Sequence, residues 1–162
     1  MFDTPTRKLT LAGILVAIAV LGGVFSFPVL GSRCAPVQHL VNILAAVFLG
    51  PLWGVGVAFS ASLLRNIAGL GSLMAFPGSM VGALVCGVVY RYTHRLGLTC
   101  IAEALGTGIL GALAAYPVAA LLMGLSPASY TVYIVPFLIS TGAGSIAAYI
   151  LLRFLLPKLP RG

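Results

Sequence analysis

The sequence predicts an all-α integral membrane protein with six transmembrane helices, and composition is the first reason. Of its 162 residues, 60% are hydrophobic and 7% are charged, whereas about a quarter of the residues in an average soluble domain are charged. A membrane-spanning helix takes about 20 residues, so the chain has room for six or seven spans and for no additional soluble domain. We therefore expect residues 1–162 to form a single transmembrane domain.

Apolar stretches separated by turn signals give the expected spans: 9–27, 37–49, 52–68, 77–92, 98–123 and 130–156. The first is too long for the core of a signal peptide, so we interpret it as a retained span. The second is short for a full crossing and should be tilted or shielded by its neighbours. Gly50-Pro51 predicts a tight turn after it. Pro77 suits the first turn of the fourth span, and Pro117 should kink or end the fifth.

The positions of the cationic residues support six spans with both termini in the cytoplasm. In that topology seven of the nine lie on one face, and positively charged residues mark the cytoplasmic side; they are Arg7, Lys8, Arg91, Arg95, Arg153, Lys158 and Arg161. The net charge of +7 therefore reflects topology and not nucleic-acid binding. Arg33 and Arg65 depart from the pattern, so each needs another reason to be there.

Acidic residues are nearly absent, since the chain holds only Asp3 and Glu103. Enzymes that use paired carboxylates or carboxylate-bound metals need several acids together, so we expect no enzymatic activity and no cofactor. Cys34 and His39 are spaced like metal ligands, but two ligands do not make a site. With no phosphate-binding loop in the sequence, uphill transport requires a partner or an ion gradient. We expect Glu103, near the cytoplasmic end of its span, to pair with Arg91 or Arg95 or to face a partner, away from any ligand.

Polar residues of the second span form the first half of a candidate ligand site. Gln38 and Asn42 are four residues apart and His39 and Asn42 three apart, so a helix places all three on one arc of its surface. Polar side chains in a membrane helix are costly unless they meet partners or a polar ligand. This cluster falls near the outer end of its span.

The second half of the candidate site comes from the other spans. Arg65 lies roughly 20 Å above the cytoplasmic start of its span, at 1.5 Å per residue. The outer half also contains Asn66, Phe76, Ser79, Tyr116, Tyr133 and Phe137. Aromatic walls with a few polar groups are typical of small-molecule sites. Two alternatives stay open: Arg65 could bond a backbone carbonyl or Asn66, and Tyr130 and Tyr133 could be interfacial residues.

Small residues recur every four positions in the first, fourth and fifth spans, which lets helices approach closely. In the fourth and fifth spans we expect packing within the molecule. In the first span, where Gly13 and Ala17 are four apart, contact with a partner protein is the alternative to internal packing.

Several segments together resemble one known family. They are Cys34-Ala-Pro-Val-Gln-His-Leu-Val-Asn42, Leu49-Gly-Pro51, Leu64-Arg-Asn66, Ala75-Phe-Pro-Gly-Ser79, Glu103-Ala-Leu-Gly-Thr-Gly108, Tyr116-Pro117 and Val135-Pro-Phe137. They are similar to the ThiW family of substrate-binding S components of energy-coupling factor (ECF) transporters. The resemblance implies six helices in a prokaryotic cell membrane, and high-affinity capture of a vitamin precursor from outside. It also implies a transmembrane coupling protein and two cytoplasmic ATPases as partners.

The resemblance further implies a substrate, hydroxyethylthiazole, the thiazole precursor of thiamin. Its ring would stack on Phe76, Tyr116 or Tyr133, and its polar atoms would bond to the amide and imidazole groups of the second span. Arg65 would be structural, would donate hydrogen bonds to a neutral ligand, or would indicate a phosphorylated one.

Gly13-x-x-x-Ala17 resembles the Ala-x-x-x-Ala surface with which S components dock, with glycine as a departure at the first position. The alternative function is a stand-alone channel or secondary transporter for a small heterocyclic solute. It differs from the S component in needing no ATPase.

Overall fold

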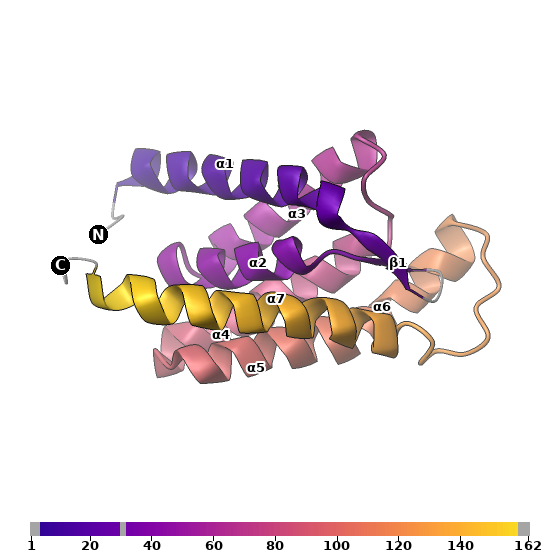
Figure 1. Cartoon of the computed structure of the whole chain (residues 1–162). Helices are drawn as coiled ribbons and strands as arrows, with labels where there is room; N and C mark the ends of the chain where they lie inside the picture. Colours follow the sequence, from indigo (N-terminus) through magenta and orange to yellow (C-terminus); the bar gives the residue numbers. More distant parts are fainter. Residues whose placement is uncertain (1–3, 30–31, 159–162) are drawn as a thin grey trace.

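The computed structural model describes residues 4–29 and 32–158, so Asp3 and Arg161 lie outside the described residues. Its helices lie side by side in an elongated bundle (Figure 1). The elements are α1 (Pro5–Gly22), η1 (Gly23–Phe25), β1 (Phe27–Val29), β2 (Ser32–Cys34), α2 (Pro36–Phe48), α3 (Pro51–Ile67), α4 (Ala75–Thr93), α5 (Leu96–Leu105), η2 (Gly106–Gly111), α6 (Ala112–Pro117), η3 (Val118–Leu122), α7 (Ile134–Leu155) and η4 (Leu156–Lys158).

The bundle exposes large apolar side chains and buries several polar ones, which a soluble protein would place the other way round. Leu52 and Leu121 are 79% and 83% exposed, whereas Asn42 and Arg65 are at most 2% exposed. Among the described residues, three helical stretches are long and apolar enough to cross a membrane: Pro5–Phe25, Leu96–Leu122 and Ile134–Lys158. An outer surface of this kind needs hydrocarbon around it, so the chain is an all-α membrane protein.

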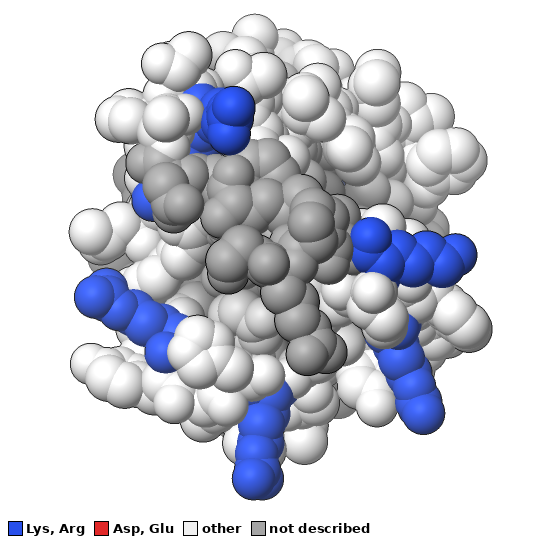
Figure 2. Space-filling view, turned by 90° about the vertical axis from the view of Figure 1, so that its left-hand side faces the viewer, with Lys and Arg blue, Asp and Glu red and all other residues white. Residues whose placement is uncertain are grey.

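The two ends of the bundle differ. The start of α1, the turn between α4 and α5 and the end of α7 lie at one end, which we call the terminal end (Figure 1). Figure 2 looks onto this end and shows Lys and Arg side chains projecting around it. The side chains of Arg7, Lys8, Arg91, Arg95, Arg153 and Lys158 are all exposed or partly exposed. The opposite end, the loop end, carries the β1–β2 hairpin, the α3–α4 loop and the segment before α7.

A short hairpin connects the first two expected spans. β1 and β2 pair antiparallel, with Phe27 opposite Cys34 and Val29 opposite Ser32. Arg33, on β2, donates from Nη1 to the carbonyl of Gly69 at 3.1 Å. The hairpin is thereby fastened to the α3–α4 loop and feeds directly into α2.

The expected fifth span is one helical stretch that continues through Pro117. Two π-helical segments, η2 and η3, flank the short α6 that ends at this proline. Proline has no N–H to donate within a helix, and the wider π turns absorb the mismatch without ending the helix. The expected end of the helix at Pro117 is therefore wrong, because the helical stretch continues to Leu122.

Glycines bring α4 into close contact with α5 and η2. A Cβ on Gly111 would lie 2.7 Å from the Cα of Gly78, and one on Gly106 would lie 3.2 Å from the Cα of Gly82. The predicted packing of these spans within the molecule is confirmed. Gly13 behaves differently, since a Cβ there would meet nothing within 4 Å.

Two of the three apolar clusters in the described residues frame the interior. The larger joins α1, α2, α3, α5 and α7 toward the terminal end and includes Leu15, Val41, Ile43, Leu44 and Leu152. The smaller lies toward the loop end and contains Met74, Ala112, Ala115, Ala119, Tyr133 and Phe137. Polar side chains converge between these clusters.

Candidate functional site

Three polar side chains of α2 turn into the middle of the bundle. Gln38, His39 and Asn42 are all buried. α2 is only 13 residues long and begins at Pro36, directly behind the hairpin. Gln38 and His39 are its third and fourth residues and Asn42 is its middle residue, so the polar face runs from the loop-end start of α2 to its middle.

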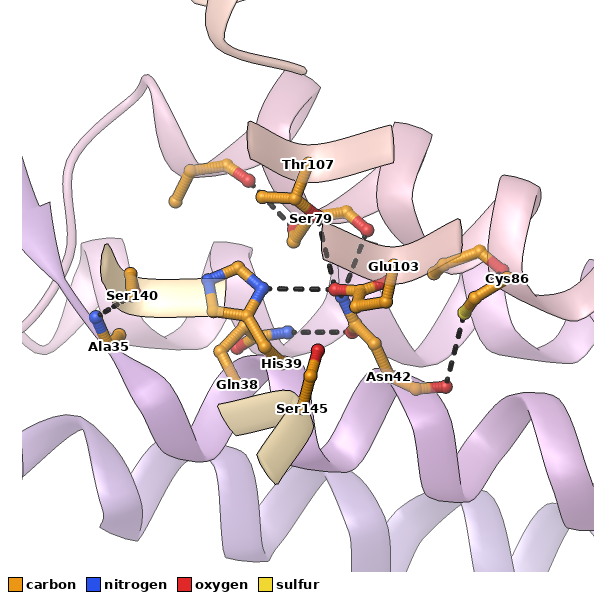
Figure 3. A network of polar contacts seen from close by, with 12 residues as sticks. Ala35, Gln38, His39, Asn42, Ser79, Cys86, Glu103, Thr107, Ser140 and Ser145 are labelled. Atoms are coloured by element: carbon orange, nitrogen blue, oxygen red, sulfur yellow. Dashed lines mark hydrogen bonds and ion pairs between the residues drawn. The ribbon is translucent and has the colours of Figure 1, made fainter. Parts of the chain in front are cut away.

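Glu103, from α5, is the centre of the polar network (Figure 3). Its Oε1 lies 3.0 Å from His39 Nδ1, and it accepts hydrogen bonds from Asn42 Nδ2 at 3.0 Å and Thr107 Oγ1 at 3.1 Å. Asn42 Nδ2 also donates to the carbonyl of Ser79 at 3.1 Å. One carboxylate thereby connects α2, α5 and η2.

This position contradicts the expectation that Glu103 pairs with Arg91 or Arg95, or faces a partner, at the cytoplasmic end. Glu103 is fully buried and is the eighth residue of α5, or roughly 10 Å from the start of that helix at 1.5 Å per residue. The short α2 brings Asn42 to the same depth. The prediction was wrong because it placed Glu103 by its position along its own span, which does not reveal the contacts with His39 and Asn42 on α2.

Two amides link this carboxylate to the buried arginine. Gln38 Nε2 donates to Asn42 Oδ1 at 3.4 Å, and Arg65 Nη1 donates to Gln38 Oε1 at 3.4 Å. Arg65 Nη2 also donates to the carbonyl of Leu70 at 3.3 Å. Opposite charges are thus joined through a relay of amides and are not in direct contact.

Both charged groups keep an unused polar atom. Within residues 4–29 and 32–158, buried Arg65 Nε and Glu103 Oε2 have no hydrogen-bond partner. Each faces backbone: a Cβ on Gly23 would lie 2.8 Å from Nε, and one on Gly82 would lie 2.8 Å from Oε2. An unsatisfied buried polar atom costs about 1–3 kcal/mol.

A narrow cavity of about 30 Å³ lies beside the network. Its lining residues are Ser32, Arg33, Ala35, Gln38, His39, Arg65, Ser72, Ala75, Gly78, Ser79, Thr107, Phe137 and Ser140. About 10–15 Å³ admits one water molecule, so this form of the cavity has room for about two. A ring-sized ligand requires the lining to move apart.

Half of the ten predicted ligand residues line the cavity, and the others lie elsewhere. Five line the cavity, namely Gln38, His39, Arg65, Ser79 and Phe137. Asn42 lies behind them in the network. Asn66 instead holds the α3–α4 loop, since its Nδ2 donates to the carbonyls of Ser62 at 2.8 Å and Ser72 at 3.1 Å.

The remaining aromatic residues pack elsewhere. Phe76 lies against Phe59, with ring centroids 5.6 Å apart. Tyr116 stacks on Tyr130 at 3.9 Å, and buried Tyr133 belongs to the apolar cluster at the loop end. Phe137 is thus the one predicted aromatic among the cavity-lining residues in the described part of the chain.

Sequence reasoning missed several lining residues. Thr107 is four residues after Glu103, so it shares its helix face. Arg33 had a signal of its own, because it breaks the charge pattern, as Arg65 does. Ser140 gave none: it accepts a 2.7 Å hydrogen bond from the backbone N–H of Ala35, a contact between segments far apart in sequence.

Two further groups hold the site's surroundings. Ser79 Oγ donates its one hydrogen to the Ala75 carbonyl at 2.7 Å. Towards Ser62 it can therefore only accept, so the hydroxyl of Ser62 donates to Ser79 Oγ at 3.0 Å and joins α3 to α4. Burial raises the pKa of the Cys34 thiol, which donates to the Pro136 carbonyl at 3.1 Å. In the described residues no group of three or more His, Cys, Asp or Glu could hold a metal ion.

A family model described as thiamine-precursor transporter protein (ThiW) matches residues 9–158. No curated protein and no solved structure matches the chain. The match covers every element that contributes to the cavity.

Proposed function

The chain belongs to the ThiW family of thiamine-precursor transporter proteins, and on that premise we propose that it is the substrate-binding S component of an ECF-type importer. The observation that carries the proposal is the buried polar network beside the cavity. His39, Gln38 and Arg65 converge there from two helices in an otherwise apolar interior. Ionisable groups inside a membrane protein mark ligand or ion sites.

The proposed topology has six spans with both termini cytoplasmic. The cationic terminal end then faces the cytoplasm, in the plasma membrane of a prokaryote. The hairpin and the α3–α4 loop, which border the cavity, face outward. A ligand from outside would enter between them, past the exposed Arg33–Gly69 hydrogen bond that joins the hairpin to the loop.

Hydroxyethylthiazole is the substrate that we propose. Its small ring suits a site with Phe137 as one wall, and its few polar atoms suit the surrounding amide, imidazole and guanidinium groups. Glu103 offsets the charge of Arg65 through the amide relay, which favours a neutral ligand over a phosphorylated one. Binding would also require the narrow cavity to widen.

The proposed partners are a transmembrane coupling protein and two cytoplasmic ATPases. On α1, Ala12, Leu15 and Ala19 are buried in the bundle, whereas Gly13 and Ala17 are exposed on the outward face. Small residues on an outward face allow close approach of another helix. We assign docking to this face.

Calorimetric titration of purified protein with hydroxyethylthiazole tests the substrate. Trp53 makes a poor fluorescent reporter, because it lies 12 residues before Arg65 on α3, or roughly 18 Å away at 1.5 Å per residue. Saturable binding of hydroxyethylthiazole, tighter than that of its phosphate, is expected. Absence of heat at high micromolar ligand in a folded sample rejects this substrate.

Uptake assays test the assembly. We expect uptake of hydroxyethylthiazole only in cells that also contain the coupling protein and ATPases. The matched variant Gly13→Leu should still bind the ligand but lose uptake. Uptake that persists without ATPases would identify a stand-alone transporter instead.

A further inference from the structure

His39 presents a different nitrogen to each side of its ring. Nδ1 lies 3.0 Å from Glu103 Oε1. Figure 3 shows the second ring nitrogen, Nε2, pointing away from Glu103 on the side of Ser140. Both His39 and Ser140 line the cavity, and no residue in the described ranges makes a hydrogen bond to Nε2.

The carboxylate sets which nitrogen of His39 carries the proton. Glu103 Oε1 already accepts hydrogen bonds from Asn42 and Thr107, and an ionised carboxylate is an acceptor only. Nδ1 must therefore carry the hydrogen in this contact. In a neutral imidazole the other nitrogen is then an acceptor.

The buried site already holds a cation besides its one carboxylate. Arg65 contributes one permanent positive charge, which Glu103 offsets through Gln38 and Asn42. A second cation at His39 would leave excess positive charge in a region shielded from water, which is costly. Titratable or charged groups around the ring are Glu103 from α5, Arg65 from α3 and Arg33 from β2.

Donors occupy another wall of the cavity. Nη1 and Nη2 of Arg65 each carry two hydrogens, and each uses one of them in a hydrogen bond within the described residues. The site thus offers an acceptor at His39 and spare donors at Arg65. A matching ligand has one donor and one acceptor.

We propose that Glu103 is a positioning residue that fixes His39 in the Nδ1-protonated form, so that Nε2 accepts a hydrogen bond from a hydroxyl group of the ligand. The inference rests on the proposed function. It deepens that function by specifying the substrate class as a small, neutral heteroaromatic alcohol, whose ring heteroatom accepts from Arg65. An ester at that hydroxyl removes the hydrogen that Nε2 requires.

The first test observes the tautomer directly, in protein labelled only at its histidine ring nitrogens. The chain has two histidines, and His94→Asn leaves the signal of His39 alone. Asn suits that position because His94 has φ 49° and Asn tolerates left-handed backbone. Nitrogen NMR at neutral pH should show a protonated Nδ1 and a bare Nε2. A protonated Nε2, in either the other tautomer or a doubly protonated ring, overturns the proposal.

The second test compares hydroxyethylthiazole with 5-ethyl-4-methylthiazole, which lacks only the hydroxyl. In the wild type, loss of the hydroxyl should weaken binding by at least about tenfold, because a buried acceptor is left unpaired. In His39→Phe, which keeps a ring but no acceptor, the two ligands should bind within about threefold of each other.

Glu103→Gln distinguishes a residue that fixes the tautomer of His39 from one that only holds the fold together. A neutral amide can donate to Nδ1 as well as accept from it, so the tautomer is no longer fixed. We expect a folded variant whose preference for the alcohol falls severalfold and whose nitrogen spectrum shifts toward protonated Nε2. An unchanged preference and spectrum overturn the proposal. Equal wild-type affinity for both thiazoles overturns it while leaving the proposed function intact, whereas failure of both to bind rejects the substrate itself.

Discussion

The two faces of α2 show how one short helix supports two kinds of interior. Val41, Ile43 and Leu44 enter the apolar cluster toward the terminal end, where contacts are nonspecific and close-packed. Gln38 and Asn42, within the same 13 residues, enter a network in which each partner is a particular atom on another helix. Mutations on the apolar face should lower the stability of the protein and leave ligand affinity unchanged. Mutations on the polar face should lower ligand affinity as well.

The largest effect should come from removing the centre of the polar network. Glu103→Leu leaves the donors of Asn42, Thr107 and His39 without their shared acceptor, and each buried donor left unpaired costs about 1–3 kcal/mol. Denaturant unfolding in detergent should show the loss of stability, and calorimetry a loss of binding. Normal ligand affinity in this variant would show that the network and the ligand site are separate.

Truncating a core side chain on the apolar side should lower stability by a similar amount but leave ligand affinity unchanged. Leu152 is fully buried in the apolar cluster, so Leu152→Ala should destabilise the protein by about 2–5 kcal/mol. Its affinity for the ligand should stay within about twofold of wild type, because remote sites act independently. A large change in affinity with little change in stability would mean that the two halves are coupled.

Truncation of either cavity-lining group should act mainly on binding. Arg65→Ala or His39→Ala should weaken ligand binding by tenfold or more, about 1.4 kcal/mol. The matched controls are Arg153→Ala and His94→Ala, both exposed at the terminal end, and they should bind normally. Wild-type affinity in either cavity variant would make that residue structural.

The smallest effect should be kinetic and confined to the loop end. Arg33→Gln removes the exposed bond to the Gly69 carbonyl, and a bond of this kind contributes about 0.5–1.5 kcal/mol. The hairpin should open more often, so ligand association measured by stopped flow should be about threefold faster. Unchanged association and dissociation rates would show that ligand enters by another route.

Local patterns in the sequence were sufficient for the helical class and for part of the site. The three-and-four spacing of Gln38, His39 and Asn42 put them on one face, and the isolated charge of Arg65 marked it as unusual; three of these four line the cavity. Glycine spacing likewise predicted the contact of α4 with α5 and η2. Each of these signals depends on residues close together in the chain.

The rest depended on geometry that no local pattern contains. Glu103 lies 64 residues from His39, and their contact follows from how deeply a short helix sits in the bundle. Tyr116 and Phe76 were assigned by depth alone, but each turns toward another aromatic ring, Tyr130 or Phe59. The position of a residue along its helix gives its depth in the bundle. The rotation of the helix about its own axis decides which neighbours the side chain contacts.

Native mass spectrometry of the protein purified from its membrane tests the central claim, that the polar half of the bundle captures a thiamin precursor. Wild type and Leu152→Ala should both carry an adduct with the mass of hydroxyethylthiazole, and Arg65→Ala should not, with folding of all three checked in parallel. Two results would contradict the account: an adduct of that mass that is still present in Arg65→Ala, or an adduct that is missing from Leu152→Ala alone.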